Sequence, residues 1–324
     1  MATRLAADLG TRTGGPYSAP IGGPDWTPFD TTDLLLILAR INLVAGLAVV
    51  LVLLLRAPAR RLFGAHCGYG LWLTVPFAIA GSLMPPHVAA GRASLLETIL
   101  NQLKAWLGAD SHAQALMVLW LIGLIASAAF VIWRQARFLS AAKAGLAGPA
   151  VVGVIGTRVV APADIAQRFT PEERRLVRAH ERAHMDRLDA RYNAAAVLAR
   201  CAGWFNPLLH LAAPAMRLDQ EIACDATVME RLPSMRRSYA EALLRSSGAV
   251  ADLPLGCQWT ARGAHPLETR LNALVNGAPT AERRDFGSAL LLILCATAFA
   301  GGWALEPPYR APVAPMVIYI DLTP

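Results

Sequence analysis

Apolar and polar residues form long alternating blocks along this chain, and four of the apolar blocks approach the length of a membrane span. A helix needs roughly 20 apolar residues to cross about 30 Å of hydrocarbon. The four blocks cover residues 34–55, 63–84, 113–133 and 286–305. The second is the weakest because Pro76 and several glycines interrupt it. No basic segment leads into a short apolar one before the first block, so we expect no cleaved signal peptide and a first span that stays in the protein.

Basic residues near the ends of the blocks predict the orientation of the chain. They gather between the first and second blocks, after the third and before the fourth, as Arg56, Arg60, Arg61, Arg134, Arg137, Lys143, Arg283 and Arg284. Because short loops rich in Lys and Arg stay in the cytoplasm, residues 1–33, 85–112 and 306–324 are expected outside it. The pattern predicts a multi-pass protein of the inner (cytoplasmic) membrane with both termini extracytoplasmic.

Two features of this membrane part allow alternative interpretations. Residues 95–107 of the outer loop carry apolar side chains at helical spacing, which predicts an amphipathic helix that either lies in the membrane interface or caps the bundle. Arg40 and Asn42 lie inside the first block. They either snorkel or contact a neighbouring helix, which is the interpretation we favour, or they serve a function inside the membrane.

One large polar region, residues 134–285, is long enough to form a domain with its own core. It begins with a β-branched stretch at 151–160, which predicts a short hairpin closed near Gly156 and Thr157. This hairpin either offers an edge to an extended substrate or only supports the helices behind it.

The rest of the polar region is predicted to be helical. Capping residues and prolines indicate three helices, from Thr170 to about Cys201, from Asn206 to about Leu232, and over residues 236–247. The expected fold class is therefore mainly α: a polytopic helical membrane protein with residues 34–133 forming three spans, a mostly helical domain containing a small β-hairpin, and a fourth span at 286–305.

Composition supports membrane residence and argues against two other classes of protein. Apolar residues make up 55% of the chain and charged residues 16%, with a mean hydropathy of +0.41, which is too apolar for an ordinary soluble domain. The five cysteines are scattered without Cys-x-x-Cys spacing, so neither a disulfide framework nor a thiolate metal site is expected. The net charge of +7 is spread along the chain, and no direct nucleic-acid binding is expected.

The polar region contains the pentapeptide His180-Glu181-Arg182-Ala183-His184. Histidines four residues apart lie on one face of a helix and can bind the same zinc ion. In His-Glu-x-x-His sites the glutamate takes a proton from the water that attacks a peptide carbonyl. Glu181 is therefore the candidate base, and His180 and His184 are candidate ligands. An exposed helix with scattered histidines is the alternative.

A catalytic zinc ion usually has three protein ligands, and Glu221 is the best candidate for the third. Glu221 and Asp225 lie one turn apart on the next predicted helix, so Glu221 can bind the metal while Asp225 orients a ligand. The alternative is a solvated acidic face in which these carboxylates and Asp219 pair with Arg217. Cys224 lies between the two carboxylates, and we expect it to pack rather than bind metal.

In this order the motifs resemble the BlaR/MecR-type antirepressor family of membrane zinc peptidases, part of the gluzincin group. The resemblance covers most of the chain from the first span to the fourth. It rests on Glu172-Glu173-Arg174, Ala179-His180-Glu181-Arg182-Ala183-His184, Asp189, Trp204-Phe205-Asn206-Pro207-Leu208, Arg217-Leu218-Asp219-Gln220-Glu221-Ile222-Ala223-Cys224-Asp225 and Tyr239-Ala240-Glu241-Ala242-Leu243-Leu244.

The resemblance implies that His180, His184 and Glu221 bind Zn²⁺, that Glu181 is the base, and that Asp189 and Asp225 support the site. It also implies a zincin-like peptidase domain inserted on the cytoplasmic side between the third and fourth spans. Well-known members continue into a large extracellular penicillin-binding domain, whereas only residues 306–324 follow the fourth span here. Sensing of β-lactams by these residues is therefore not expected.

By resemblance, the substrate is a cytoplasmic transcriptional repressor of the BlaI/MecI kind, and cleavage serves signal transduction. Two other functions stay open. One is a membrane quality-control or processing protease with the same chemistry and another substrate, and the other is a non-catalytic signalling scaffold with a structural metal site. The expected partners are thus the lipid bilayer and a protein substrate.

Overall fold

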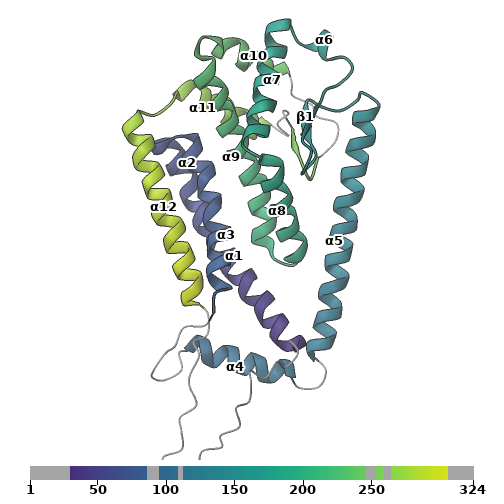
Figure 1. Ribbon diagram of the computed structural model, residues 1–324, viewed down its shortest axis with the longest axis vertical. Coiled ribbons are helices and arrows are strands. Elements are labelled where there is room, and N and C mark those ends of the chain that lie inside the picture. The colour runs from purple at the N-terminus through teal and green to yellow at the C-terminus, as the bar shows by residue number, and fades with distance from the viewer. Residues whose placement is uncertain (1–29, 86–94, 109–111, 246–252, 259–263, 306–324) are drawn as a thin grey trace, which may run out of the picture.

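The computed structural model describes residues 30–85, 95–108, 112–245, 253–258 and 264–305 (Figure 1). The expected extracytoplasmic tail at 306–324 and nearly all of the amino-terminal segment lie outside the described residues, as do parts of the loop 85–112.

Three helices among the described residues are long and apolar enough to cross a membrane: α1 (Thr31–Phe63), α5 (His112–Lys143) and α12 (Ala281–Ala304). They contain the first, third and fourth predicted spans. The second predicted span is divided into α2 (Ala65–Gly70), the 3₁₀ turn η1 (Leu71–Leu73) and α3 (Thr74–Ser82), each too short to cross alone. The number of four spans therefore stays a prediction.

The break before the second span has a local cause. Gly64 ends α1 with φ of 97°, a left-handed conformation that glycine adopts without strain. The chain then turns back, and α3 packs closely along α12. Gly302 permits this approach, because a Cβ atom there would collide with the carbonyl oxygen of Ala78.

The helix predicted in the outer loop is confirmed as α4 (Leu95–Gly108). Figure 1 shows α4 lying across the ends of α1 and α5, and Lys104 Nζ lies 2.7 Å from Asp33 Oδ1 at the start of α1. These contacts fit a helix that caps this end of the bundle.

The predicted hairpin is confirmed and belongs to a three-stranded sheet. Strands β1 (Ala150–Val152) and β2 (Arg158–Val160) are antiparallel, with Val151 opposite Val159. Strand β3 (Cys257–Gln258), which the sequence did not predict, pairs with the other side of β1. The fully buried β1 is thus the central strand, and β2 is an edge strand.

The helices of the polar region include the three predicted ones, with one correction, and also α6 and α11, which were not predicted individually. They are α6 (Ile165–Arg168), α7 (Pro171–Asp186), α8 (Asp189–Ala202), α9 (Pro207–Arg231), the 3₁₀ turn η2 (Pro233–Met235), α10 (Arg236–Arg245) and α11 (Ala264–Asn276). The single helix expected from Thr170 to about Cys201 is wrong. Leu188 adopts φ of 58° and separates α7 from α8, so the chain changes direction before Asp189.

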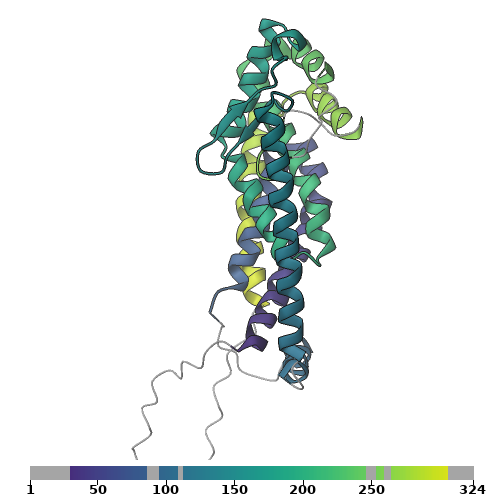
Figure 2. The ribbon, with the colours of Figure 1, turned by 90° about the vertical axis from the view of Figure 1, so that its right-hand side faces the viewer.

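The core of this region lies between α7, α9, α10 and α11. Leu176 and Val177 of α7 pack against Val228 of α9, and Tyr239 and Leu243 of α10 complete the buried cluster. The helix α8 and the first half of α9 extend away from this core, with α9 packed beside α1 and α8 packed beside α5 (Figures 1 and 2).

Candidate metal centre

The two histidines of the pentapeptide lie on α7, a helix with a complete capping box. Thr170 Oγ accepts from the backbone N–H of Glu173, and the Glu173 side chain accepts from the N–H of Thr170. One helical turn separates His180 from His184, and both are fully buried. Their Nε2 atoms lie 3.0 Å apart.

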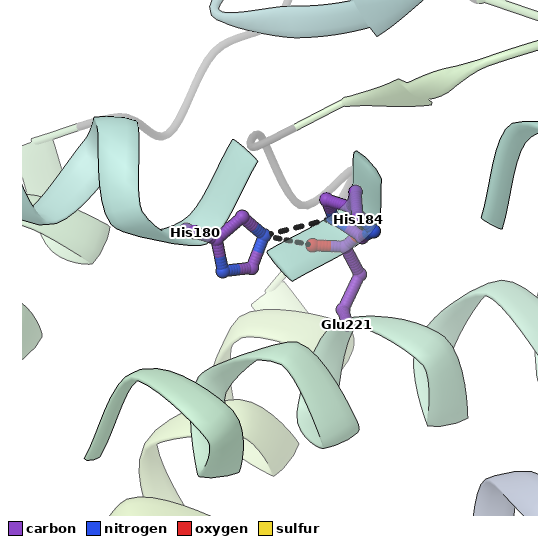
Figure 3. Close-up of side chains that lie close together, drawn as sticks. All are labelled: His180, His184 and Glu221. Atoms are coloured by element: carbon purple, nitrogen blue, oxygen red, sulfur yellow. Dashed lines mark hydrogen bonds and ion pairs between the residues drawn. The ribbon is translucent and has the colours of Figure 1, made fainter. Parts of the chain in front are cut away.

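Glu221 of α9 joins the two histidines, as Figure 3 shows. Its Oε2 lies 3.2 Å from Nε2 of His180, and its Oε1 lies 3.4 Å from Nε2 of His184. A tetrahedral zinc ion with bonds of about 2.0–2.1 Å holds its donor atoms roughly 3.3 Å apart. The three predicted ligands therefore have the chemistry and the spacing that zinc requires. The Glu221 side chain is 15% exposed, whereas the two histidines are fully buried.

Both histidines are oriented through their other ring nitrogen. Nδ1 of His184 lies 2.8 Å from Oδ2 of Asp189. Nδ1 of His180 lies 2.8 Å from the hydroxyl oxygen of Tyr239, which itself donates a 2.6 Å hydrogen bond to Asp225. Such partners hold the proton on Nδ1 and leave Nε2 free for a metal. Asp189 and Asp225 thus lie where the sequence placed supporting residues, and Tyr239 is the link for Asp225.

Arg270 of α11 is a further residue of the site, and the sequence analysis missed it. It is fully buried, donates to both oxygens of Asp225 at 2.7 and 2.8 Å, and lies 3.2 Å from Glu221 Oε2. A signal was present, because Arg270 lies among Leu267, Leu271 and Leu274 on a helix face that is otherwise apolar.

Arg270 also sets the charge of the neighbouring carboxylates. Burial would raise the pKa of Asp225, but the Arg270 guanidinium outweighs it and lowers that pKa below its usual value. Burial acts likewise on Glu221, and His184 and Arg270 hold the pKa of Glu221 well below its ordinary value. Both groups are therefore carboxylates at neutral pH.

Glu181 differs from these two carboxylates because neither of its oxygens has a hydrogen-bond partner within the described part of the chain, although both are buried. Burial raises the pKa of Glu181 to about 7, against the lowering effect of His180 and His184. An unpaired carboxyl group beside three metal donors, with a pKa near neutrality, suits a group that accepts and returns a proton.

Comparison with known proteins agrees with this geometry. Residues 141–274 match the family described as BlaR1 peptidase M56. We call these matched residues the M56 domain. Together with the apolar helices, the match identifies a membrane protein with a metallopeptidase-type domain.

The chain is also similar to the regulatory protein BlaR1 of Bacillus licheniformis, with 27% identity over 158 residues, which is 48% of this chain and 26% of that protein. The methicillin resistance mecR1 proteins of Staphylococcus aureus and Staphylococcus epidermidis are 28% identical over 100 residues, which is 31% of this chain and 17% of theirs. The chain thus aligns with about a quarter or less of each relative. No solved structure matches it.

The acidic residues of the M56 domain do not form the solvated face considered as an alternative. Asp219 is 1% exposed and lies 3.1 Å from Arg56, close to Arg60, and 3.0 Å from Trp72 Nε1. Arg217, the partner considered for it, donates instead to backbone carbonyls, including that of Leu253 at 3.0 Å. The alternative is wrong because Asp219 is buried and is paired with Arg56 and Arg60 of the first predicted span and with Trp72 of the second.

The M56 domain also contacts the second predicted span close to the candidate ligand His184. The hydroxyl group of Tyr69 in α2 donates to Asp189 Oδ1 at 3.1 Å and accepts from Gln220 at 2.9 Å. Asp189 therefore joins Tyr69 to His184. No local pattern in the sequence pointed to Tyr69.

Cys224 packs beside the metal donors of the M56 domain, as expected. Its Sγ lies 3.2 Å from His184 Nδ1 and 3.5 Å from Asp189, so the three residues form a second group within ligand distance. Burial raises the pKa of Cys224 to about 12, so its thiol stays protonated at neutral pH. Because the Nδ1 atom of His184 is already bonded to Asp189, the group around Glu221 is the better metal site.

Proposed function

We propose that this chain is a membrane-embedded zinc metalloendopeptidase of the BlaR/MecR antirepressor type. The observation that supports the activity best is the convergence of His180, His184 and Glu221 beside the unpaired carboxyl group of Glu181. The substrate we propose is a cytoplasmic repressor of the BlaI/MecI kind, which fits the relatives named regulatory protein BlaR1 and methicillin resistance mecR1 protein.

The residues act in three roles. His180, His184 and Glu221 would hold Zn²⁺, whose Lewis acidity polarises a peptide carbonyl and makes water a stronger nucleophile. Glu181 accepts the proton of the attacking water and transfers it to the leaving amine, which a group with a pKa of about 7 can do in both directions.

The remaining residues keep the ligands in place. Asp189 fixes the ring of His184, and Tyr239 fixes the ring of His180. Arg270 keeps Asp225 and Glu221 ionised, so that Glu221 is a carboxylate when metal arrives.

For topology we propose that residues 134–285 form the peptidase region on the cytoplasmic side of the inner membrane, between a third and a fourth span. The basic residues at the ends of α1, α5 and α12 support this orientation. The second span would be formed jointly by α2, η1 and α3.

Purified protein in detergent tests the assignment through two readouts, bound zinc and cleavage of a BlaI/MecI-type repressor. Wild type should hold about one zinc ion and cleave. Glu181→Gln should keep the metal and lose cleavage, whereas Glu221→Ala should lose the metal. The exposed Glu172 on the same helix supplies the matched control, and Glu172→Gln should behave as wild type.

Other outcomes distinguish the alternative functions. Zinc binding with cleavage of an unrelated unfolded protein, and not of the repressor, would favour a quality-control or processing protease. Zinc binding without any cleavage would favour a signalling scaffold. Absence of bound metal from folded wild type would refute the peptidase assignment.

A further inference from the structure

The turn between α8 and α9 lies between two predicted membrane spans. Trp120 of α5 donates its indole N–H to the carbonyl oxygen of Ala202 at 2.8 Å, and Trp204 donates to the carbonyl oxygen of Trp120 at 3.3 Å. On the other side, the amide of Asn206 donates to the carbonyl oxygen of Asn42 in α1 at 3.1 Å. Figures 1 and 2 show α8 and the first half of α9 running alongside these spans.

Helix lengths show how deep the turn lies. Arg56 lies fourteen positions after Asn42, and Arg134 lies fourteen positions after Trp120, which is about 21 Å along each helix at 1.5 Å per residue. Arg56 and Arg134 begin the basic clusters at the cytoplasmic ends of the spans. Because the helices tilt, these lengths are upper limits on depth. A depth of about 15 Å would put the turn at the midplane of a hydrocarbon layer about 30 Å thick.

Most side chains of this segment are apolar, although it contains the exposed His210, whose Nε2 lies 2.8 Å from the carbonyl oxygen of Trp204. Residues 201–216 contain no Asp, Glu, Lys or Arg. Leu198, Phe205 and Leu211 are 69%, 49% and 59% exposed, although they are large and apolar. Arg200 is the charged residue nearest to the turn in sequence, and its side chain is long enough to extend toward the cytoplasmic surface.

Several polar groups of the turn are paired within the protein. The N–H of Gly203 donates to the carbonyl oxygen of Ala199, and that of Asn206 donates to the carbonyl oxygen of Gly203, both at 2.8 Å. The Asn206 side chain accepts from the N–H of Leu208 at 3.0 Å. In hydrocarbon each unsatisfied backbone group costs several kcal/mol, so this pairing is what an embedded turn requires.

We propose that the α8–α9 hairpin is a re-entrant element of the membrane. Its turn enters the cytoplasmic half of the bilayer between α1 and α5, and the exposed faces of Leu198, Phe205 and Leu211 contact lipid acyl chains. The peptidase region is then anchored within the bilayer by part of its own sequence, in addition to the spans at its two ends.

The position of α9 also places the candidate metal centre relative to the membrane surface. Asp219, which Arg56 and Arg60 hold at the end of α1, lies two residues before Glu221 on α9. Two residues advance a helix by about 3 Å, so the metal ligands lie at the membrane surface. This consequence rests on the proposed function. If the site is a peptidase site, a protein substrate is cut where it lies against the cytoplasmic face of the bilayer.

Spin labels on single introduced cysteines test the proposal in lipid vesicles without any assay of activity. Labels at Phe205→Cys and Leu211→Cys report on the hairpin, Ile125→Cys on the lipid-facing side of α5, and Leu244→Cys on α10. Ile125 and Leu244 are 65% and 54% exposed. The five native cysteines are buried, so labelled wild type serves as the blank.

The collision rates of each spin label with oxygen, which dissolves in hydrocarbon, and with a water-soluble nickel chelate are then measured. They distinguish a label in lipid from one in water and from one covered by protein. The labels at 205 and 211 should collide often with oxygen and rarely with the nickel chelate, as the label at 125 is expected to do. Nickel collisions equal to those at 244 would overturn the proposal by placing the hairpin in water. Protection from both reagents would also overturn it, because protein would then cover these side chains. Each labelled variant is checked by size-exclusion chromatography for a single monodisperse peak. Two hairpin positions are labelled so that the test does not depend on the folding of any one variant.

Discussion

Replacing the buried Arg270 by methionine should destabilise the metal-free M56 domain strongly. Methionine has similar length and no charge, so the change leaves Asp225, which is 1% exposed, without its two hydrogen bonds from the guanidinium. It also removes the cation 3.2 Å from Glu221. Removing one partner of a buried ion pair costs about 3–5 kcal/mol.

The size of the effect can be measured as a shift in the melting temperature. For a domain of this size, 1 kcal/mol corresponds to roughly 2–4 °C, so Arg270→Met should lower Tm by roughly 6–20 °C. Arg237→Met is the matched control, since the exposed pair of Arg237 with Glu241 is worth about 0–1 kcal/mol. Unfolding is followed in detergent with a chelator present, because bound metal would add stability of its own.

A double variant separates the ion pair from the loss of packing. Asp225→Asn removes the carboxylate charge that Arg270 neutralises, so Arg270→Met/Asp225→Asn should be more stable than the sum of the two single changes predicts. A coupling free energy of roughly 0.5–3 kcal/mol is expected. Strict additivity, or a Tm shift for Arg270→Met no larger than that of Arg237→Met, would refute the reasoning.

Three further predictions concern the metal ligands and the helix that carries them. Asp189→Asn should weaken metal binding about 10–100-fold in competition with a chelator, because it disturbs the partner of His184; unchanged affinity would contradict the role of Asp189. Tyr69→Phe removes the bond from α2 to Asp189 and should weaken metal binding by less than Asp189→Asn does; a larger loss would mean that Tyr69 acts elsewhere. Thr170→Ala breaks the capping box and should cost about 1 kcal/mol of unfolding free energy; no change in stability would show that the box is dispensable.

Elements with a regular pattern over many residues were predictable from the sequence. The apolar runs identified α1, α5 and α12, and the Asn206-Pro207 start identified α9. Strand β3 has only two residues and pairs with β1, which lies about a hundred positions earlier, so no local sequence pattern predicts it. The break after α7 was missed because neither Gly nor Pro marks it.

For the metal centre, the sequence predicted the donors better than their surroundings. His180, His184 and Glu221 lie in two short motifs whose helical spacing can be read directly, and the structure brings them together. Arg270 and Tyr69 contact the site from helices far away in sequence, where only tertiary packing decides the neighbour. Long-range partners of this kind leave no periodic signal.

The missed break at Leu188 explains why the site and the membrane hairpin occur together. In one continuous helix, Asp189 would be rotated about 140° from His184, since five residues turn the helix by about 500°, and its carboxylate would face away from the ligand. The left-handed conformation of Leu188, which costs a non-glycine residue about 1–2 kcal/mol, places Asp189 2.8 Å from His184 instead. The same turn sends α8 toward α5 rather than onward from α7. This one strained residue therefore positions Asp189 to orient the proposed ligand His184 and also directs the proposed membrane hairpin toward α5.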